Sequence, residues 1–351
     1  MRYKKTAAFL LAGAVAASLV LGGCGSTINS DAIVATCGDQ EISLGYLNFV
    51  AHYNQAIYDY MIGTYSGTDY WTSELYYDDN GDSMETSVKN AIMEEVETDC
   101  LLEQHMPDYG VEITAEETEE MQTAAEDFMA ENTKEGIKAM GATEEYVQEM
   151  LYYETVKARM QEAIEADVGN DLDPEDYKQR TFSYVQVSLN GYYDEDGSYV
   201  EYTDEEVVGL EVDAQLFAES AKEDFDQAVE DYGGTIYTYS YGEDEAGEDE
   251  GGFCEAVIEE ADKMHVGDVA GPIEGDGYLY IIRLDSEDDE EATEAAVETA
   301  EGEVKTEYYN EVVDGYMEDS DFSYDESLWE KVKFTDLFDV TYSDEDEAVE
   351  E

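Results

Sequence analysis

Apolar residues recur at three- and four-residue spacing over residues 32–166, and this spacing predicts a mostly helical region. Ser43, Thr114 and Thr143 are of the types that cap helix N-termini, and Thr114 with Glu117 has the spacing of a capping box. The predicted elements are a short strand at 32–37 and helices at about 43–61, 85–106, 114–130 and 143–166.

The pattern changes after residue 173, where alternating apolar positions predict strands. Thr181–Leu189 alternates with period two, and Gly277–Leu284 is rich in β-forming residues. Between them we predict a return strand at 199–202, helices at 203–221, 225–232 and 255–263, and an acidic, glycine-rich loop at 233–252. This order of elements predicts an inserted α+β domain over residues 173–285.

The C-terminal region, residues 286–351, continues as a helix to about Met317 and ends in an apolar and aromatic segment. Trp329, Phe334 and Phe338 have to be buried, because exposing this apolar surface to water is unfavourable. We therefore expect the segment to pack on the helical domain at 32–172, which is then built from both ends of the chain. The predicted fold class is α+β.

The first 23 residues have the organisation of a secretory signal: a basic start, then an apolar run from Thr6 to Leu21. The run has 16 residues, fewer than the ~20 that a helix needs to span a bilayer. Leu21-Gly22-Gly23-Cys24 resembles the lipobox of bacterial lipoproteins. We therefore expect a signal peptide at 1–23, lipidation at Cys24, and a tether at 24–31 outside the membrane. Two or more acyl chains on a protein give stable anchoring in the membrane. The alternative is an ordinary signal peptide followed by an incidental cysteine.

The charge of the chain excludes one class of partner. Its 91 acidic and 16 basic residues give a formal net charge of −75. Nucleic acid is excluded, because its binding depends on Lys and Arg that neutralise phosphates, and basic partners are favoured. With 43% hydrophobic residues and 30 tyrosines, the chain is too apolar for a disordered acidic polymer, so we expect a folded core.

The remaining cysteines and the acidic turns do not define a metal site. Cys37, Cys100 and Cys254 match neither a disulfide framework nor a zinc site, and the sequence leaves their pairing open. The acidic turns at 78–81 and 194–197 lack the ligand order of an EF-hand loop. We predict no metal site, and weak, diffuse binding of divalent cations stays an alternative.

Three segments in the second half of the chain resemble the parvulin-type peptidyl-prolyl isomerase domain. Phe225–Tyr232 is similar to the family's "FEELAKEYS" helix, Val266–Ile273 to its "VGEVSGPV" turn, and Gly277–Leu284 to its "FGYHIIKL" strand. Together with the lipobox, a helical domain opening "IVATCGDQEISLGYLNF" and the returning C-terminal helix, the layout resembles PrsA- and SurA-type foldases. The resemblance implies a SurA-like helical domain with an inserted parvulin-like β-α-α-α-β domain, and no cofactor.

The chain departs from this family at the catalytic positions. Parvulins use two histidines that face each other across the central strands, and here those positions are Tyr184 and Tyr280. The histidines that are present, His52, His105 and His265, occupy none of the motif positions, and we expect them to be structural or solvated.

Prolyl isomerisation has a barrier of ~18–20 kcal/mol, and a thousandfold acceleration requires ~4 kcal/mol of selective transition-state stabilisation. Tyr184 and Tyr280 could donate hydrogen bonds to the twisted amide. Val257, Ile258 and Met264 could line the proline pocket. The alternative is that both tyrosines only pack an inert core.

These observations predict a lipid-anchored extracytoplasmic folding factor of the isomerase family, with weak or lost isomerase activity. Its expected partners are unfolded or partly folded secreted polypeptides, and the membrane through the lipid on Cys24. The first alternative is a holdase chaperone without catalysis. The second is an acidic, cation-binding surface lipoprotein.

Overall fold

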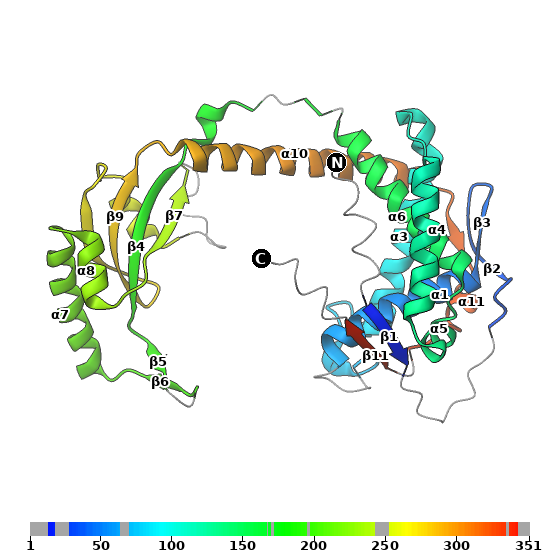
Figure 1. The fold of residues 1–351 in the computed structure, drawn as a ribbon, viewed down its shortest axis with the longest axis horizontal. Helices are drawn as coiled ribbons and strands as arrows, with labels where there is room; N and C mark the ends of the chain where they lie inside the picture. Colours follow the sequence, from blue (N-terminus) through cyan, green and yellow to red (C-terminus); the bar gives the residue numbers. More distant parts are fainter. Residues whose placement is uncertain are drawn as a thin grey trace. The chain divides into compact units, whose positions relative to one another are not determined.

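The computed structural model divides into two compact units (Figure 1). The helical unit combines Met1–Val168 with Thr306–Glu351, and the sheet unit is Gly169–Lys305. The residues that the structure describes are 13–17, 28–63, 70–166, 168–169, 172–194, 197–242, 253–334 and 337–342. Cys24 and most of the expected signal peptide lie outside these residues.

The helices of the helical unit begin where the sequence places capping residues. Ser43 and Thr143 accept hydrogen bonds from the backbone of the helices that follow them, and Thr114 forms the predicted capping box with Glu117. The helical elements are α1 (Leu44–Tyr58), a π-turn (Asp59–Gly63), a 3₁₀ turn (Glu74–Tyr76), α3 (Met84–Tyr109), α4 (Ala115–Glu131), α5 (Lys134–Met140), α6 (Glu144–Glu165), the end of α10 (Glu290–Glu318) and α11 (Glu326–Trp329). Within the unit, α6 packs against both α3 and α4.

One predicted helix boundary was wrong, and one helix was not predicted. Helix α3 does not stop before Pro107 but continues to Tyr109, where Gly110 caps it with a left-handed φ of 65°. Pro107 removes one helical hydrogen bond, and because it lies in the last turn the disturbance does not reach the rest of α3. In addition, α5 separates α4 from α6, and its N-cap is Thr133.

The C-terminal segment returns to the helical unit, which confirms the predicted fold class. Strand β10 (Ser323–Tyr324) pairs with β2 (Ile33–Cys37), and β2 pairs with β3 (Gln40–Ser43). The buried Lys89 donates from Nζ to the carbonyls of Trp329 and Val332, at 3.0 and 2.9 Å. Trp329, Phe334 and Phe338 are at most 8% exposed and belong to the same core as α1 and α3.

A further pair of strands includes part of the expected signal peptide. Strand β1 (Gly13–Ala17) runs antiparallel to β11 (Phe338–Tyr342). The lipoprotein prediction implies that β1 leaves with the signal and that the mature chain keeps β11. Among the described residues, no helix is both long enough and apolar enough to cross a membrane.

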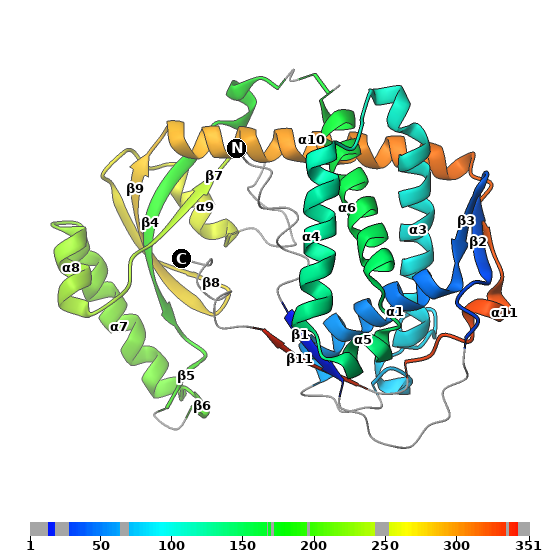
Figure 2. The same cartoon turned by 45° about the vertical axis from the view of Figure 1, so that its right-hand side comes forward.

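The sheet unit is built on a four-stranded antiparallel sheet in the order β7-β4-β9-β8. Its strands are β4 (Arg180–Ser188), β7 (Tyr237–Tyr241), β8 (Val269–Gly275) and β9 (Tyr278–Ser286). Helices α7 (Asp204–Ala221) and α8 (Phe225–Tyr232) cover one face, and α9 (Glu255–Ala261) covers the other (Figure 2). Alternate residues of β4 and β9 face the two layers, as period-two patterning requires.

Two strands of this unit differ from the prediction. Residues 199–202 do not pair with the first long strand, because β6 (Tyr199–Glu201) forms a separate hairpin with β5 (Gly191–Tyr193). The partner of β4 on that side is β7, inside the stretch predicted to be a loop. Its alternating tyrosines are β-formers, but the acidic and glycine-rich residues beside them dominated the pattern.

Candidate functional site

The two tyrosines that replace the parvulin histidines lie side by side on the face of the sheet that α9 covers. Tyr184 on β4 is opposite Ile282, and Tyr280 on β9 is opposite Gln186, so the two are diagonal neighbours on one face. Their ring centroids are 6.2 Å apart, with 55° between the planes. The register of the two central strands therefore brings together the pair that the sequence singled out.

An aromatic side chain that the sequence pattern did not indicate lies against both tyrosines. The ring of Phe253 is 4.9 Å from that of Tyr184 and 5.4 Å from that of Tyr280. It also contacts Tyr239 on β7 at 4.6 Å and Phe182 on β4 at 5.3 Å. We call these five side chains the aromatic cluster. Only the long-range pairing of β7 and the position of the segment before α9 bring Phe253 here, so local pattern gave no signal for it.

The three residues expected to line a proline pocket lie beneath this cluster. Val257, Ile258 and Met264 are 0%, 1% and 6% exposed, and they belong to the same buried cluster as Tyr280. These side chains and the two tyrosines form one apolar cluster, and we call the three its apolar floor; their contact with a proline ring stays a prediction. Arg180 fixes this floor, because its Nη2 donates to the carbonyls of Ala261 and Met264 at 3.1 and 3.0 Å.

The surroundings keep both phenols protonated at neutral pH. Burial, with smaller contributions from the neighbouring Cys254 and Asp276, raises the pKa of Tyr280 to about 12. Burial also raises the pKa of Tyr184, with smaller effects from Tyr237 and Tyr239. Among the described residues, neither hydroxyl has a hydrogen-bond partner, so each keeps an unused O–H donor.

Cys254 borders the aromatic cluster, although its place in the sequence put it beyond a loop. It is half-buried beside Tyr280, and a Cβ on Gly275 of β8 would collide with its Sγ. The absence of a side chain at Gly275 therefore makes room for the thiol. Cys37 and Cys100 are buried neighbours in the helical unit, and all three described thiols are free.

The three histidines are not part of the aromatic cluster. His52 and His105 belong to the helical unit, where Nδ1 of His52 bonds to the carbonyl of Asn48 at 2.8 Å. His265 has an 83% exposed side chain and pairs with Glu287 at 3.1 Å.

The acidic turns bind their own backbone. Oδ1 of Asp78 accepts from the amides of Asn80 and Asp82, and Oδ1 of Asp194 accepts from the amide of Ser198. Within the described part of the chain, no group of three or more His, Cys, Asp or Glu side chains is arranged to hold a metal ion.

Comparison with known proteins finds similarity only among solved structures. No protein-family model and no curated protein matches the sequence. The foldase PrsA from Lactococcus lactis is 11% identical over 86% of this chain and 99% of its own, with a TM-score of 0.35. PrsA from Bacillus subtilis is 18% identical over 74% and 98%, with a TM-score of 0.23. A structure from work on the SurA-like chaperones PEB4 and Cj1289 of Campylobacter jejuni is 12% identical over 84% and 99%, with a TM-score of 0.28.

The chain resembles PrsA- and SurA-type foldases. These are the proteins that the parvulin-like motifs and the returning C-terminal segment predicted. With identities below 25% and TM-scores below 0.5, the likeness does not establish an activity. A function has to be inferred from the aromatic cluster and from the grooves of the helical unit.

Proposed function

We propose that this chain is an extracytoplasmic protein-folding factor that binds unfolded or partly folded polypeptides and retains weak prolyl isomerase activity. The observation that supports it most is the pair of phenol hydroxyls, Tyr184 and Tyr280, on an apolar floor and without a partner among the described residues. A proline ring is apolar, and its amide loses conjugation as it twists. Such a surface can hold the ring and donate to the twisted amide.

Two neutral donors account for weak rather than strong catalysis. A hydrogen bond from an uncharged phenol contributes about 0.5–1.5 kcal/mol, so two of them supply less than the ~4 kcal/mol of a thousandfold acceleration. Tyr184 and Tyr280 also pack against Phe253, which restricts how far their rings can turn. We therefore expect acceleration on the order of ten- to a hundredfold over buffer.

Exchange measurements on a proline peptide test this activity. The purified protein should accelerate cis/trans exchange measured by NMR, and Tyr184→Phe and Tyr280→Phe should each lower the rate about three- to tenfold. Tyr193→Phe is a matched control, because Tyr193 is 74% exposed on the β5–β6 hairpin. Exchange no faster than in buffer would contradict the isomerase activity. Equal rates for all variants would show that Tyr184 and Tyr280 do not contribute to it.

A second candidate function, holding clients without catalysis, is supported by a groove in the helical unit. A cavity of about 520 Å³ lies along α4 and α6, with an apolar floor that includes Met121, Ala124 and Leu151 and with Tyr309 at its side. Ion pairs lie along the rim of the cavity, among them Arg159–Glu117 at 2.6 Å. An apolar floor with a charged rim suits an extended polypeptide that presents an apolar side chain.

An aggregation assay separates this function from catalysis. The protein should suppress aggregation of a proline-free client, and Ala124→Glu should weaken suppression by placing a charge on the groove floor. Glu119→Gln, exposed on α4, is the control for changes in that helix. Unchanged aggregation in the presence of the protein would contradict the holdase function.

We propose that the lipid on Cys24 anchors this folding factor outside the membrane. The lipobox-like Leu21–Cys24 supports this anchoring. Cys24→Ala should abolish labelling by radioactive palmitate and release the protein from the membrane fraction, and retained labelling would contradict the assignment. Diffuse cation binding is the remaining alternative, and calorimetry with millimolar calcium tests it.

A further inference from the structure

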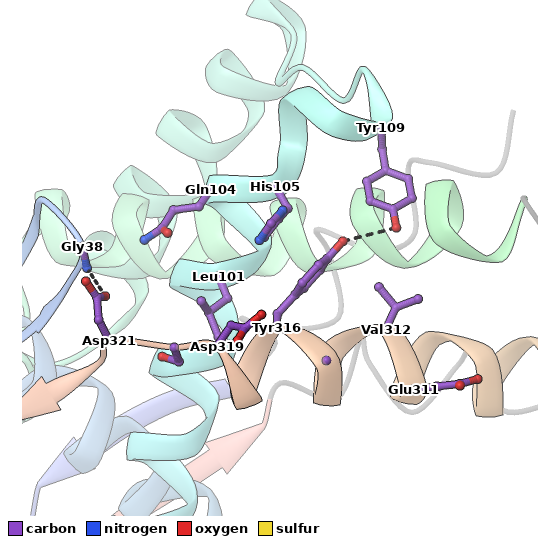
Figure 3. Close-up of a pocket in the computed structure, with 12 residues that line it drawn as sticks. Gly38, Leu101, Gln104, His105, Tyr109, Glu311, Val312, Tyr316, Asp319 and Asp321 are labelled. Carbon is purple, nitrogen blue, oxygen red and sulfur yellow. Dashed lines mark hydrogen bonds between the residues drawn. The ribbon is translucent and has the colours of Figure 1, made fainter.

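A second cavity in the helical unit has an aromatic wall and an acidic rim. It measures about 730 Å³ and lies between the end of α3, the last turns of α10 and the β2–β3 turn (Figure 3). All its lining residues belong to the helical unit. Its size is within the range of ordinary small-ligand sites.

The aromatic wall is a flat pair of rings held in place by hydrogen bonds. His105 and Tyr316 stack with centroids 3.8 Å apart and 4° between their planes. The hydroxyl of Tyr316 donates to that of Tyr109 at 3.2 Å, and Nδ1 of His105 donates to Asp108 at 2.7 Å. These contacts orient both rings before any ligand arrives.

The rim carries three carboxylates and no compensating cation. Glu311, Asp319 and Asp321 line the cavity, whose lining residues include no lysine or arginine. Asp321 uses Oδ1 to accept from the amide of Gly38 at 2.7 Å, which leaves Oδ2 to a ligand. Among the described residues, no basic side chain forms an ion pair with Glu311 or Asp319. The cavity therefore favours a cationic occupant.

We propose that this cavity binds an arginine side chain of an extended client polypeptide. A guanidinium is planar, stacks on aromatic rings and donates to carboxylates in a fixed fork, whereas an ammonium is a compact, strongly hydrated charge. The wall and rim together match the first of these cations. The inference rests on the proposed function for the presence of a client, and it specifies that client's chemistry as basic and extended.

The overall acidity of the chain supports this choice and also requires a control. With a net charge of −75, the protein attracts any basic peptide through its long-range field. Binding at the cavity must therefore be distinguished from diffuse attraction. The distinguishing property is geometric: a site that places carboxylates beside a stacked ring pair should prefer arginine to lysine, whereas diffuse attraction should not.

Peptide titration tests the proposal. The purified full chain is titrated, by fluorescence anisotropy at physiological ionic strength, into a glycine-serine peptide that carries an uncharged dye and two arginines. Twin peptides carry lysine or citrulline, which keeps the shape of arginine without its charge. We expect the arginine peptide to bind about fivefold more tightly than the lysine peptide, and the citrulline peptide more weakly still.

Two variants and one control localise the binding. Glu311→Gln combined with Asp319→Asn should weaken arginine binding roughly fivefold, and Tyr316→Leu should remove the preference for arginine over lysine. Asp314→Asn combined with Glu318→Gln removes the same charge from exposed positions of α10 outside the cavity, and it should bind like the unchanged protein. The Tyr316 variant is first checked for helicity. If the Tyr316 variant is unfolded, the Glu311–Asp319 double variant alone decides the test.

Equal binding of the three peptides, or equal weakening by the cavity and control variants, would overturn the proposal. Proline exchange and aggregation assays with arginine-free clients report on the proposed function separately. If those assays succeed while the arginine preference is absent, only the cavity assignment fails.

Discussion

A carboxyl group in the core of the helical unit makes stability depend on pH. Asp99 on α3 is 7% exposed, and its Oδ1 has no hydrogen-bond partner among the described residues. Burial raises its pKa to about 7 from an ordinary 3.8; Lys157 opposes this shift, whereas Glu95 and Glu154 increase it. The folded state therefore binds this proton more tightly than the unfolded chain does.

The sign of the effect follows from that difference. This group contributes most stability below the unfolded pKa of 3.8, and the contribution is lost as pH rises through about 7. Asp99→Asn removes the ionisation and should raise the free energy of unfolding by about 1–3 kcal/mol at pH 8, with a smaller gain at pH 5. Urea denaturation at both pH values measures it, with the exposed Glu94→Gln as control. A less stable Asn variant at pH 8 would mean that the carboxylate has a stabilising partner.

At the scale of elements, the sequence predicted the positions of Tyr184 and Tyr280 better than the positions of the residues around them. Tyr184 and Tyr280 lie on long strands whose period-two pattern is local, so their shared face could be inferred once the strands paired. Phe253 and Cys254 precede a short helix, and their positions depend on the non-local β4–β7 pairing and on Gly275 in β8. Local patterns carry no information about such contacts, and the same limit explains the wrong partner assigned to residues 199–202.

The link between β4 and α9 leads to a prediction at this scale. Arg180 donates to two carbonyls at the end of α9 and, through Nε, to the hydroxyl of Tyr241 at 3.2 Å. Arg180→Gln should lower the stability of the sheet unit by about 1–3 kcal/mol, because these carbonyls lose a charged donor. Amide hydrogen exchange in α9 should speed up while that in α7 changes less.

A control variant makes this test specific. Lys263→Gln removes the cation of the Lys263–Glu260 pair at the end of α9, where the lysine side chain is 65% exposed, and it should leave hydrogen exchange nearly unchanged. Equal exchange in the Arg180 variant and in the unchanged protein would show that apolar packing alone holds α9. A loss of isomerase rate in the Arg180 variant, with Tyr184 and Tyr280 intact, would identify Arg180 as a positioning residue.

At the scale of the whole molecule, the charge is the dominant feature. With a net charge of −75, the acidic side chains repel one another. This repulsion destabilises the folded state more than the unfolded chain, because charges in the unfolded chain are farther apart. The buried Asp99 acts in the same direction, because Glu95 and Glu154 increase its pKa shift. Salt screens this repulsion, so the stability of the fold should respond to ionic strength.

Salt should therefore stabilise the protein. Raising NaCl from about 0.01 to about 0.15 M shortens the screening length from ~30 to ~8 Å, and we expect the melting temperature to rise by several degrees. Calcium chloride at matched ionic strength distinguishes screening from binding. A rise equal to that in NaCl indicates screening alone, which agrees with the self-bonded acidic turns at Asp78 and Asp194. A much larger rise in calcium would favour the cation-binding alternative, because a ligand that binds only the folded state adds its own stabilisation.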